Sequence, residues 1–253
     1  MKYLKERDWP IRTDHISDGN PPEVVRSKGA LQALETYNGN MPGPKRPSSA
    51  NVVAALNRHQ CPAPFHTVRA RFMGSIASPL PGRTPVHTIQ ELWGGELPPF
   101  NGMEDLNHLF QILIDGLWNR LIVHQTESNP FKLTRLQVSQ TREGIHHYAL
   151  VRKQEIEGFM DGLFGPHEEI DLPESAREAV EVLGEIRAMF AGAITLLEDA
   201  GMPAAPDDLK GLSGNLHGLA TILEKEMNTV VLSCTRARSQ ALAEMQQAKP
   251  TVH

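Results

Sequence analysis

The sequence predicts an all-α protein, in which a compact multi-helix bundle is followed by a long antiparallel C-terminal helical hairpin. Apolar residues recur at spacings of three and four along most of the chain, which places them on one face of a helix. We interpret the sequence as free of the apolar–polar alternation that marks a half-buried strand. Clusters of Pro and Gly divide the helical pattern into separate segments.

Residues 1–47 are predicted to form an N-terminal arm, a short helix and a linker. The short helix is expected between residues 20 and 39, because it begins at Asn-Pro-Pro and ends at Asn-Gly. Residues 38–49 are rich in Gly, Pro, Ser and Asn, which favour turns. We therefore expect no regular element there.

Residues 48–170 are predicted to form a helical core domain. Helices are expected at 51–58, 64–77, 86–93, 103–125 and 142–164, each bounded by a capping residue or by Pro and Gly. Helix 103–125 carries nine apolar residues on one stripe, including Leu117 and Trp118. Truncation of either side chain to Ala is expected to lower the stability by about 2–5 kcal/mol.

Residues 171–248 are predicted to form the hairpin, with arms at 173–200 and 209–241. At 1.5 Å per residue the second arm is about 48 Å long and the first about 41 Å, so the second arm extends beyond the first. A narrow apolar stripe on an overhanging arm favours a partner. The predicted contact residues on this stripe are Leu223, Met227, Val230 and Cys234. The partner is either a second copy or a larger assembly, and the alternative is a monomer whose hairpin folds back onto the bundle.

The charges alternate in blocks along the chain. Residues 36–90 hold six Lys and Arg and no acid, whereas residues 155–208 hold fourteen acids against two Arg. This pattern indicates either neutralisation between packed helices or one basic face. In the second case Arg58, Arg69 and Arg83 can converge to bind an acidic protein. Nucleic acid is a less favoured partner, because the net charge is −5 and the aromatic residues of this region are expected to point inward.

One pattern in the sequence is compatible with a metal site. Glu143 and His147 stand four residues apart on a predicted helix, and His108 or Asp115 on helix 103–125 is a candidate to complete the ligand set. This arrangement would support a metal-dependent hydrolase. The alternative interpretation is a solvated helix face without metal.

Cys61 lies close in sequence to His59 and His66, a combination that can form an activated nucleophile. A buried thiol between two short helices is the commoner arrangement. The sequence contains no P-loop, no dinucleotide fingerprint and no nucleophile elbow. We therefore predict no catalytic residue and no cofactor.

Three short motifs resemble those of the YecA/YgfB family of helical bacterial proteins. They are Ala77-Ser78-Pro79, Leu92-Trp93-Gly94-Gly95 and Gly158-Phe159-Met160-Asp161-Gly162. The resemblance covers roughly residues 48–190 and implies an all-helical, cytoplasmic bacterial protein. It implies no catalytic residues, because the family is largely uncharacterised. The cysteine-rich metal-binding tail of some members has no counterpart at the end of this sequence.

The composition favours a location in the cytoplasm. No apolar run approaches the 18–20 residues that span a bilayer, and the first residues are too polar for a signal peptide. The two cysteines show no pairing pattern, which fits a reducing compartment. The interpretation that best fits all of these observations is a non-enzymatic binding or adaptor protein that acts through protein–protein contacts. The alternatives are the metal-dependent hydrolase and a nucleic-acid-binding regulator that uses residues 36–90.

Overall fold

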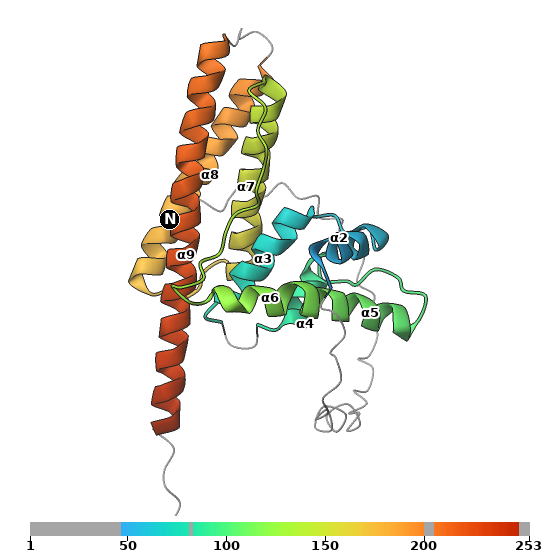
Figure 1. Ribbon diagram of the computed structural model, residues 1–253. Coiled ribbons are helices and arrows are strands. Elements are labelled where there is room, and N and C mark those ends of the chain that lie inside the picture. Colours follow the sequence, from blue (N-terminus) through green and yellow to red (C-terminus); the bar gives the residue numbers. More distant parts are fainter. Residues whose placement is uncertain (1–46, 81–82, 200–204, 248–253) are drawn as a thin grey trace, which may run out of the picture. The chain divides into compact units, whose positions relative to one another are not determined.

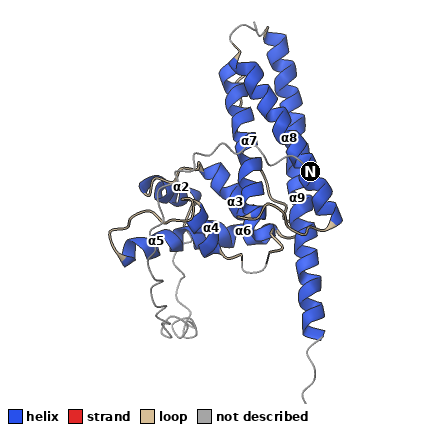
Figure 2. Ribbon diagram, turned by 180° about the vertical axis from the view of Figure 1, so that it is seen from behind, coloured by secondary structure: helices blue, strands red, loops and turns tan. Residues whose placement is uncertain are grey.

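The computed structural model describes residues 47–80, 83–199 and 205–247, and the regular elements in these ranges are all helical (Figures 1 and 2). The prediction of an all-α fold with a compact bundle is confirmed. The arm, short helix and most of the linker predicted before residue 48 lie outside the described residues, as does the chain beyond residue 247. No described helix is both long and apolar enough to cross a lipid bilayer.

The bundle begins with α2 (Ser49–Arg58), α3 (Phe65–Ala77) and α4 (Pro85–Glu91). Ser48 caps α2 by accepting a hydrogen bond from the Asn51 amide, and the Asn51 side chain accepts one from the Ser48 amide. Thr84 caps α4, and Pro85 occupies its first helical position. These caps satisfy amides that have no partner inside the helix, which explains why the predicted starts agree with the observed ones to within about two residues.

The helix predicted at 103–125 is divided into four parts. They are α5 (Met103–Leu113), a π-helical turn η1 (Ile114–Trp118), α6 (Asn119–Leu121) and a 3₁₀ turn η2 (Ile122–His124). Leu109, Leu113, Leu117 and Leu121 are all buried. Their constant spacing of four exceeds the 3.6 residues of an α-helical turn, so each step rotates the side chain by about 40°. The wider π-helical turn reduces this rotation, and all four side chains reach the core.

The closest helix packing in the bundle is between α3 and α7 (Arg142–Phe164). A Cβ atom on Gly162 would overlap with the carbonyl oxygen of Arg71, and one on Gly74 would overlap with that of Phe159. Because these positions lack a side chain, the two backbones lie in direct contact. This crossing fixes α7, on which the C-terminal helices then pack.

The C-terminal helices α8 (Glu174–Glu198) and α9 (Pro206–Gln247) lie side by side and antiparallel (Figures 1 and 2). The Ser175 and Ser233 hydroxyls are hydrogen bonded at 2.7 Å and fix their register. α7 packs on both helices, and α3 packs on α9. The described residues on either side of position 170 therefore contribute to one hydrophobic core.

α9 continues past the start of α8 (Figure 1). Arg238 anchors this part of α9 to the end of α3, because its guanidinium group donates to the carbonyl oxygens of Ile76 and Ser78 at 3.0 and 3.3 Å. The same side chain also donates to Gln125 after η2, at 2.5 Å. Ala241 and Leu242, one turn further on, are exposed.

Candidate interaction surface

The three arginines predicted to form a basic face do not converge. Arg58 pairs with Asp105 of α5 at 2.8 Å. Arg83 forms two hydrogen bonds with Glu91 of α4, at 2.5 and 3.0 Å, and its side chain is only 9% exposed. Each charge is thus matched by an acid from another part of the chain. For Arg58 and Arg83 the alternating charge blocks become neutralisation between packed elements, and these described arginines form no shared basic face.

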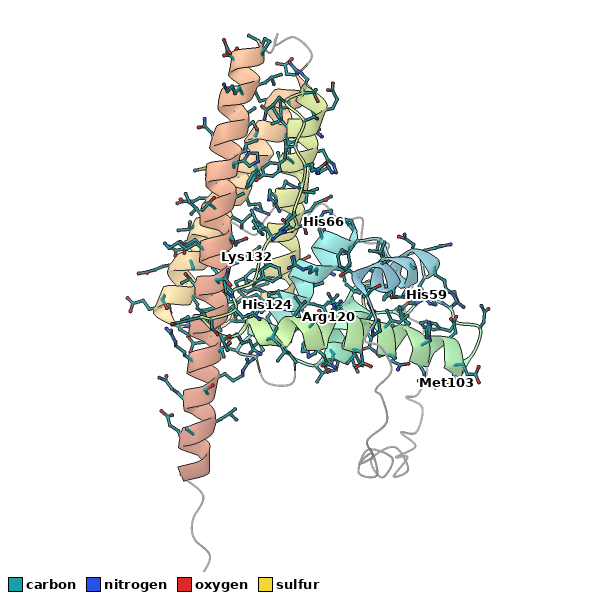
Figure 3. The ribbon with its side chains drawn as sticks, in the orientation of Figure 1. His59, His66, Met103, Arg120, His124 and Lys132 are labelled. Atoms are coloured by element: carbon teal, nitrogen blue, oxygen red, sulfur yellow. The ribbon has the colours of Figure 1, made fainter. Side chains whose placement is uncertain are left out.

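Arg69, the third of these arginines, contacts a non-helical segment that we call the strap (residues 130–138). The strap runs along α7 and α9, and Lys132 marks it in Figure 3. Arg69 donates to the carbonyl oxygen of Lys132 at 2.7 Å, and its guanidinium carbon lies 4.3 Å from the centre of the Phe131 ring. Burial lowers the pKa of Arg69, whereas the negative charges of Glu155 and Glu224 act in the opposite direction. Arg69 is half-buried, and its guanidinium group is engaged by the strap.

α9 holds the strap through Asn228 and Glu224. The Asn228 amide accepts from the Phe131 N–H at 2.7 Å and donates to the Phe131 carbonyl oxygen at 2.9 Å. Glu224 accepts from the Leu133 N–H at 3.1 Å and from the Lys132 ammonium at 2.8 Å. These side chains supply the hydrogen bonds that a neighbouring strand supplies in a sheet.

α7 holds the next part of the strap through a buried ion pair between Arg152 and Glu155. Glu155 accepts from the Thr134 N–H at 2.8 Å, and Arg152 donates to the Thr134 carbonyl oxygen at 2.7 Å. Arg152 also lies over the Tyr148 ring at 4.9 Å. A buried ion pair is stable only when its remaining polar atoms find partners, and the backbone of Thr134 in the strap supplies two of them.

The apolar stripe predicted to bind a partner lies inside the protein. Leu223, Met227, Val230 and Cys234 are each 0% exposed. The expectation that this stripe forms an exposed surface is wrong, because α9 turns it toward α8 and the bundle, even though the end of α9 extends past the start of α8. Burial also raises the pKa of Cys234 to about 11, which Arg238 only partly opposes. A thiol in this position is unreactive at neutral pH.

The candidate metal ligands are not assembled into a site. Glu143 and His147 are exposed on α7, whereas His108 is exposed on α5 and Asp115 lies in η1. Asp115 accepts a hydrogen bond from Asn119 at 3.0 Å. Within the ranges that the structure describes, no three or more His, Cys, Asp and Glu side chains are grouped so as to hold a metal ion. Neither His108 nor Asp115 therefore completes a site with Glu143 and His147 in the part of the chain that the structure describes.

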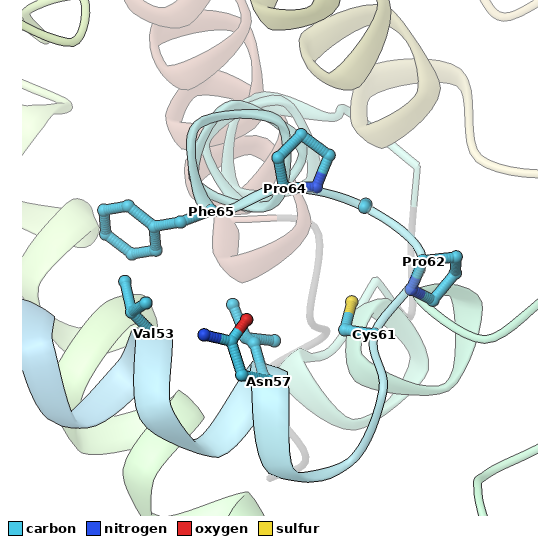
Figure 4. Close-up of a pocket in the computed structure, with 8 residues that line it drawn as sticks. Val53, Asn57, Cys61, Pro62, Pro64 and Phe65 are labelled. Atoms are coloured by element: carbon cyan, nitrogen blue, oxygen red, sulfur yellow. The ribbon is translucent and has the colours of Figure 1, made fainter.

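Cys61 borders a cavity of about 240 Å³ between α2 and the start of α3 (Figure 4). Burial raises the pKa of its thiol. The two neighbouring histidines are engaged elsewhere: the His59 ring lies 5.2 Å from the Phe100 ring, and His66 is hydrogen bonded to Gln154 of α7 at 2.7 Å. The environment of Cys61 is that of a structural thiol and lacks the groups that activate a nucleophile.

α8 and α9 present large apolar side chains to solvent. Met189 and Leu196 on α8 are 51% and 43% exposed, and Ile222 on α9 is 45% exposed. Met189 and Leu196 are seven residues apart, which is about two turns, so they share one side of α8. Val182 of α8 and Leu212 and Leu219 of α9 are half-buried.

The Ser175–Ser233 hydrogen bond shows that these side chains border the same seam. Because the helices are antiparallel and Ser175 lies opposite Ser233, position 189 lies opposite position 219, one turn from Ile222. Around the helix axes, Met189 and Ile222 are each within about 40° of these serines. The serines are solvent-accessible, and α7 packs on the other side of α8 and α9. We call the residues Val182, Met189, Leu196, Leu212, Leu219 and Ile222 the outer face.

Neither the contacts of the strap nor the outer face was predicted from the sequence. The sequence does contain a signal for the strap, namely an alternation of apolar and polar residues. Phe131 and Leu133 are buried, whereas Lys132 and Arg135 are exposed. The sequence contains no such signal for the outer face, because the exposed Met and Leu residues of α8 are of the same types as the residues of a buried stripe. Which of these residues are exposed depends on how α8 and α9 pack together.

No protein-family model, curated protein or solved structure matches the chain. The resemblance of residues 48–190 to the YecA/YgfB family stays a prediction, as does the cytoplasmic location.

Proposed function

We propose that this protein is a non-enzymatic helical binding or adaptor protein that acts through protein–protein contacts. The outer face carries this proposal. Its three most exposed side chains are large and apolar and are spaced along one side of a pair of helices whose main apolar stripes are buried. Single exposed apolar residues are common on protein surfaces, but a contiguous group along a helical seam is typical of an interaction site.

The partner predicted from the sequence is either a second copy of the chain or another protein. Both of these partners remain proposals. The surface that we propose for binding them is the outer face, in place of the buried α9 stripe. A polar substitution on this face is expected to abolish partner binding without affecting the fold, because the substituted side chain already lies in solvent.

The test compares two methionine variants of the full chain. Met189→Glu changes the outer face, and Met103→Glu is the matched control, since Met103 is 68% exposed at the start of α5, away from α8 and α9 (Figure 3). Wild type and both variants are used as bait in extracts of the source cells, and the captured proteins are identified by mass spectrometry. We expect a partner that wild type and Met103→Glu retain and Met189→Glu loses. An identical set of captured proteins for all three baits would contradict the proposal.

A further inference from the structure

We propose that the outer face binds a basic amphipathic helix of a partner protein. This inference rests on the proposed function and specifies its partner. Three features of the seam between α8 and α9 support it: its shape, its glycines and its charge.

The shape of the outer face suits a helix. Two antiparallel helices form a groove between them, and a third helix fits such a groove through apolar residues at i, i+3, i+4 and i+7. From Val182 to Leu196 the apolar part of α8 spans fifteen residues, whose first and last Cα atoms are about 21 Å apart along the axis. A partner helix of about four turns covers this length.

Glycines beside the outer face leave room for a close approach. A Cβ atom added to Gly192 of α8, or to Gly211 or Gly218 of α9, would have no neighbour within 4 Å. Glycine inside a helix costs about 1 kcal/mol relative to Ala, and these three gain no packing from the described residues in return. At the crossing of α3 and α7, by contrast, Gly74 and Gly162 are in contact with another backbone. Gly192, Gly211 and Gly218, which lie beside the outer face, leave space for the same kind of contact with a helix from outside the chain.

The charge beside the outer face is acidic. Glu178, Glu181 and Glu185 are exposed on α8, next to Val182 and Met189. Among the described residues, no Lys, Arg or His lies within ion-pair distance of these three carboxylates. The two arginines of α8 are directed elsewhere, since Arg177 donates to the Leu172 carbonyl oxygen and Arg187 faces Glu157 of α7 at 4.0 Å.

On α9, Lys225 lies near this groove but pairs with Glu226 at 3.0 Å, which leaves the groove with a net negative charge. Such a surface attracts lysine and arginine and repels acidic helices. It also disfavours a second copy of the chain, because a two-fold contact through this face would bring two sets of the same glutamates together. A basic partner helix is therefore the occupant that the charges favour.

The test uses three synthetic peptides of about 18 residues, or five helical turns. Two carry the same leucine stripe at i, i+3, i+4 and i+7, with lysines on the polar face of one and glutamates on that of the other. The third has the composition of the lysine peptide with its stripe scrambled. Binding of each labelled peptide to the full chain is measured by fluorescence anisotropy at low and high salt.

We expect the lysine peptide to bind at least about tenfold more tightly than the other two, and to weaken as salt screens the charges. Met189→Glu should weaken its binding about tenfold or more, even though the substitution adds a negative charge, because it removes an apolar contact. Met103→Glu adds the same charge elsewhere and should have no effect. The triple variant Glu178→Lys, Glu181→Lys and Glu185→Lys should reverse the preference in favour of the glutamate peptide.

Three results would each overturn the inference: no binding by any peptide, equal binding of the lysine and glutamate peptides, or binding that Met189→Glu leaves unchanged. Sedimentation of the wild type and of Met189→Glu tests whether a second copy of the chain binds the outer face instead. A dimer that this variant dissociates would assign the face to a second copy and also overturn the inference. If the peptides fail while the extract experiment still yields a partner lost with Met189→Glu, the proposed function stands and only the partner class is wrong.

Discussion

Gly162 of α7 and Gly214 of α9 are both glycines inside long helices, but their surroundings differ. Gly162 lies against the backbone of α3, at Arg71, whereas a Cβ atom on Gly214 would have no neighbour within 4 Å. At the first position glycine is required by packing. At the second it only lowers the helical propensity of the segment.

The two glycines should therefore respond to alanine with opposite signs. Gly162→Ala is expected to lower the free energy of unfolding by about 3 kcal/mol or more, because the added methyl group forces α3 and α7 apart. Gly214→Ala is expected to raise it by about 0.5–1 kcal/mol. Urea unfolding followed by circular dichroism measures both changes. A Gly162→Ala variant as stable as wild type would mean that the two helices are not in backbone contact.

At the scale of elements, the sequence predicted helices well where each has its own start and stop signals. The caps at Ser48, Thr84 and Thr141 lie at the observed starts of α2, α4 and α7. The π-helical turn at Ile114–Trp118 was not predicted, because an apolar stripe indicates a helix without distinguishing its pitch. The strap was also missed, since its backbone partners come from helices that are distant in sequence.

The strap depends on side chains of the surrounding helices, and Asn228 is the most directly testable of them. Asn228→Ala leaves both the N–H and the carbonyl oxygen of Phe131 without their protein partner. We expect a loss of about 2–4 kcal/mol in the free energy of unfolding, since each orphaned buried group costs about 1–3 kcal/mol. Asn215→Ala is the control, because Asn215 is exposed on the same helix.

In the control, stability should remain the same or rise slightly, as alanine is the better helix former. Thermal unfolding of both variants gives the comparison. If Asn228→Ala behaves like Asn215→Ala, the side chain does not hold the strap, and the hydrogen bonds of α9 to this segment contribute little to the fold.

At the scale of the whole molecule, the charge blocks in the sequence were compatible with neutralisation between packed helices or with one basic face. The structure distinguishes these two arrangements. Arg58 and Arg83 each meet an acid from a neighbouring helix, so the alternation along the chain becomes neutralisation in space. One exception is on α8, where Glu178, Glu181 and Glu185 have no basic side chain within ion-pair distance among the described residues. Sequence alone cannot identify this exception, because it depends on where Arg177 and Arg187 are directed.

The same limit applies to the apolar surface. The stripe from Leu223 to Cys234 is longer and more regular than the outer face, and for that reason it was predicted as the interaction site. A long regular stripe is also the best surface for packing within the chain, and α9 uses it in that way. The residues left in solvent are those of the shorter second stripe, around Met189 and Ile222.

Three methionines test the central claim, that the outer face is left open for a partner while the main stripe of α9 is internal. Met189 lies on the outer face and is 51% exposed, Met103 is 68% exposed elsewhere, and Met227 is 0% exposed. Oxidation converts an accessible methionine to its sulfoxide, and mass spectrometry quantifies it at each position. The measurement compares the purified protein with the same protein in extract of its source cells.

In the purified protein we predict rapid oxidation of Met103 and Met189 and protection of Met227. In the extract Met189 should become protected, while Met103 remains as reactive as before. Equal oxidation of Met189 in both conditions would contradict the claim that a partner covers the outer face, and rapid oxidation of Met227 in the purified protein would contradict the internal position of the α9 stripe.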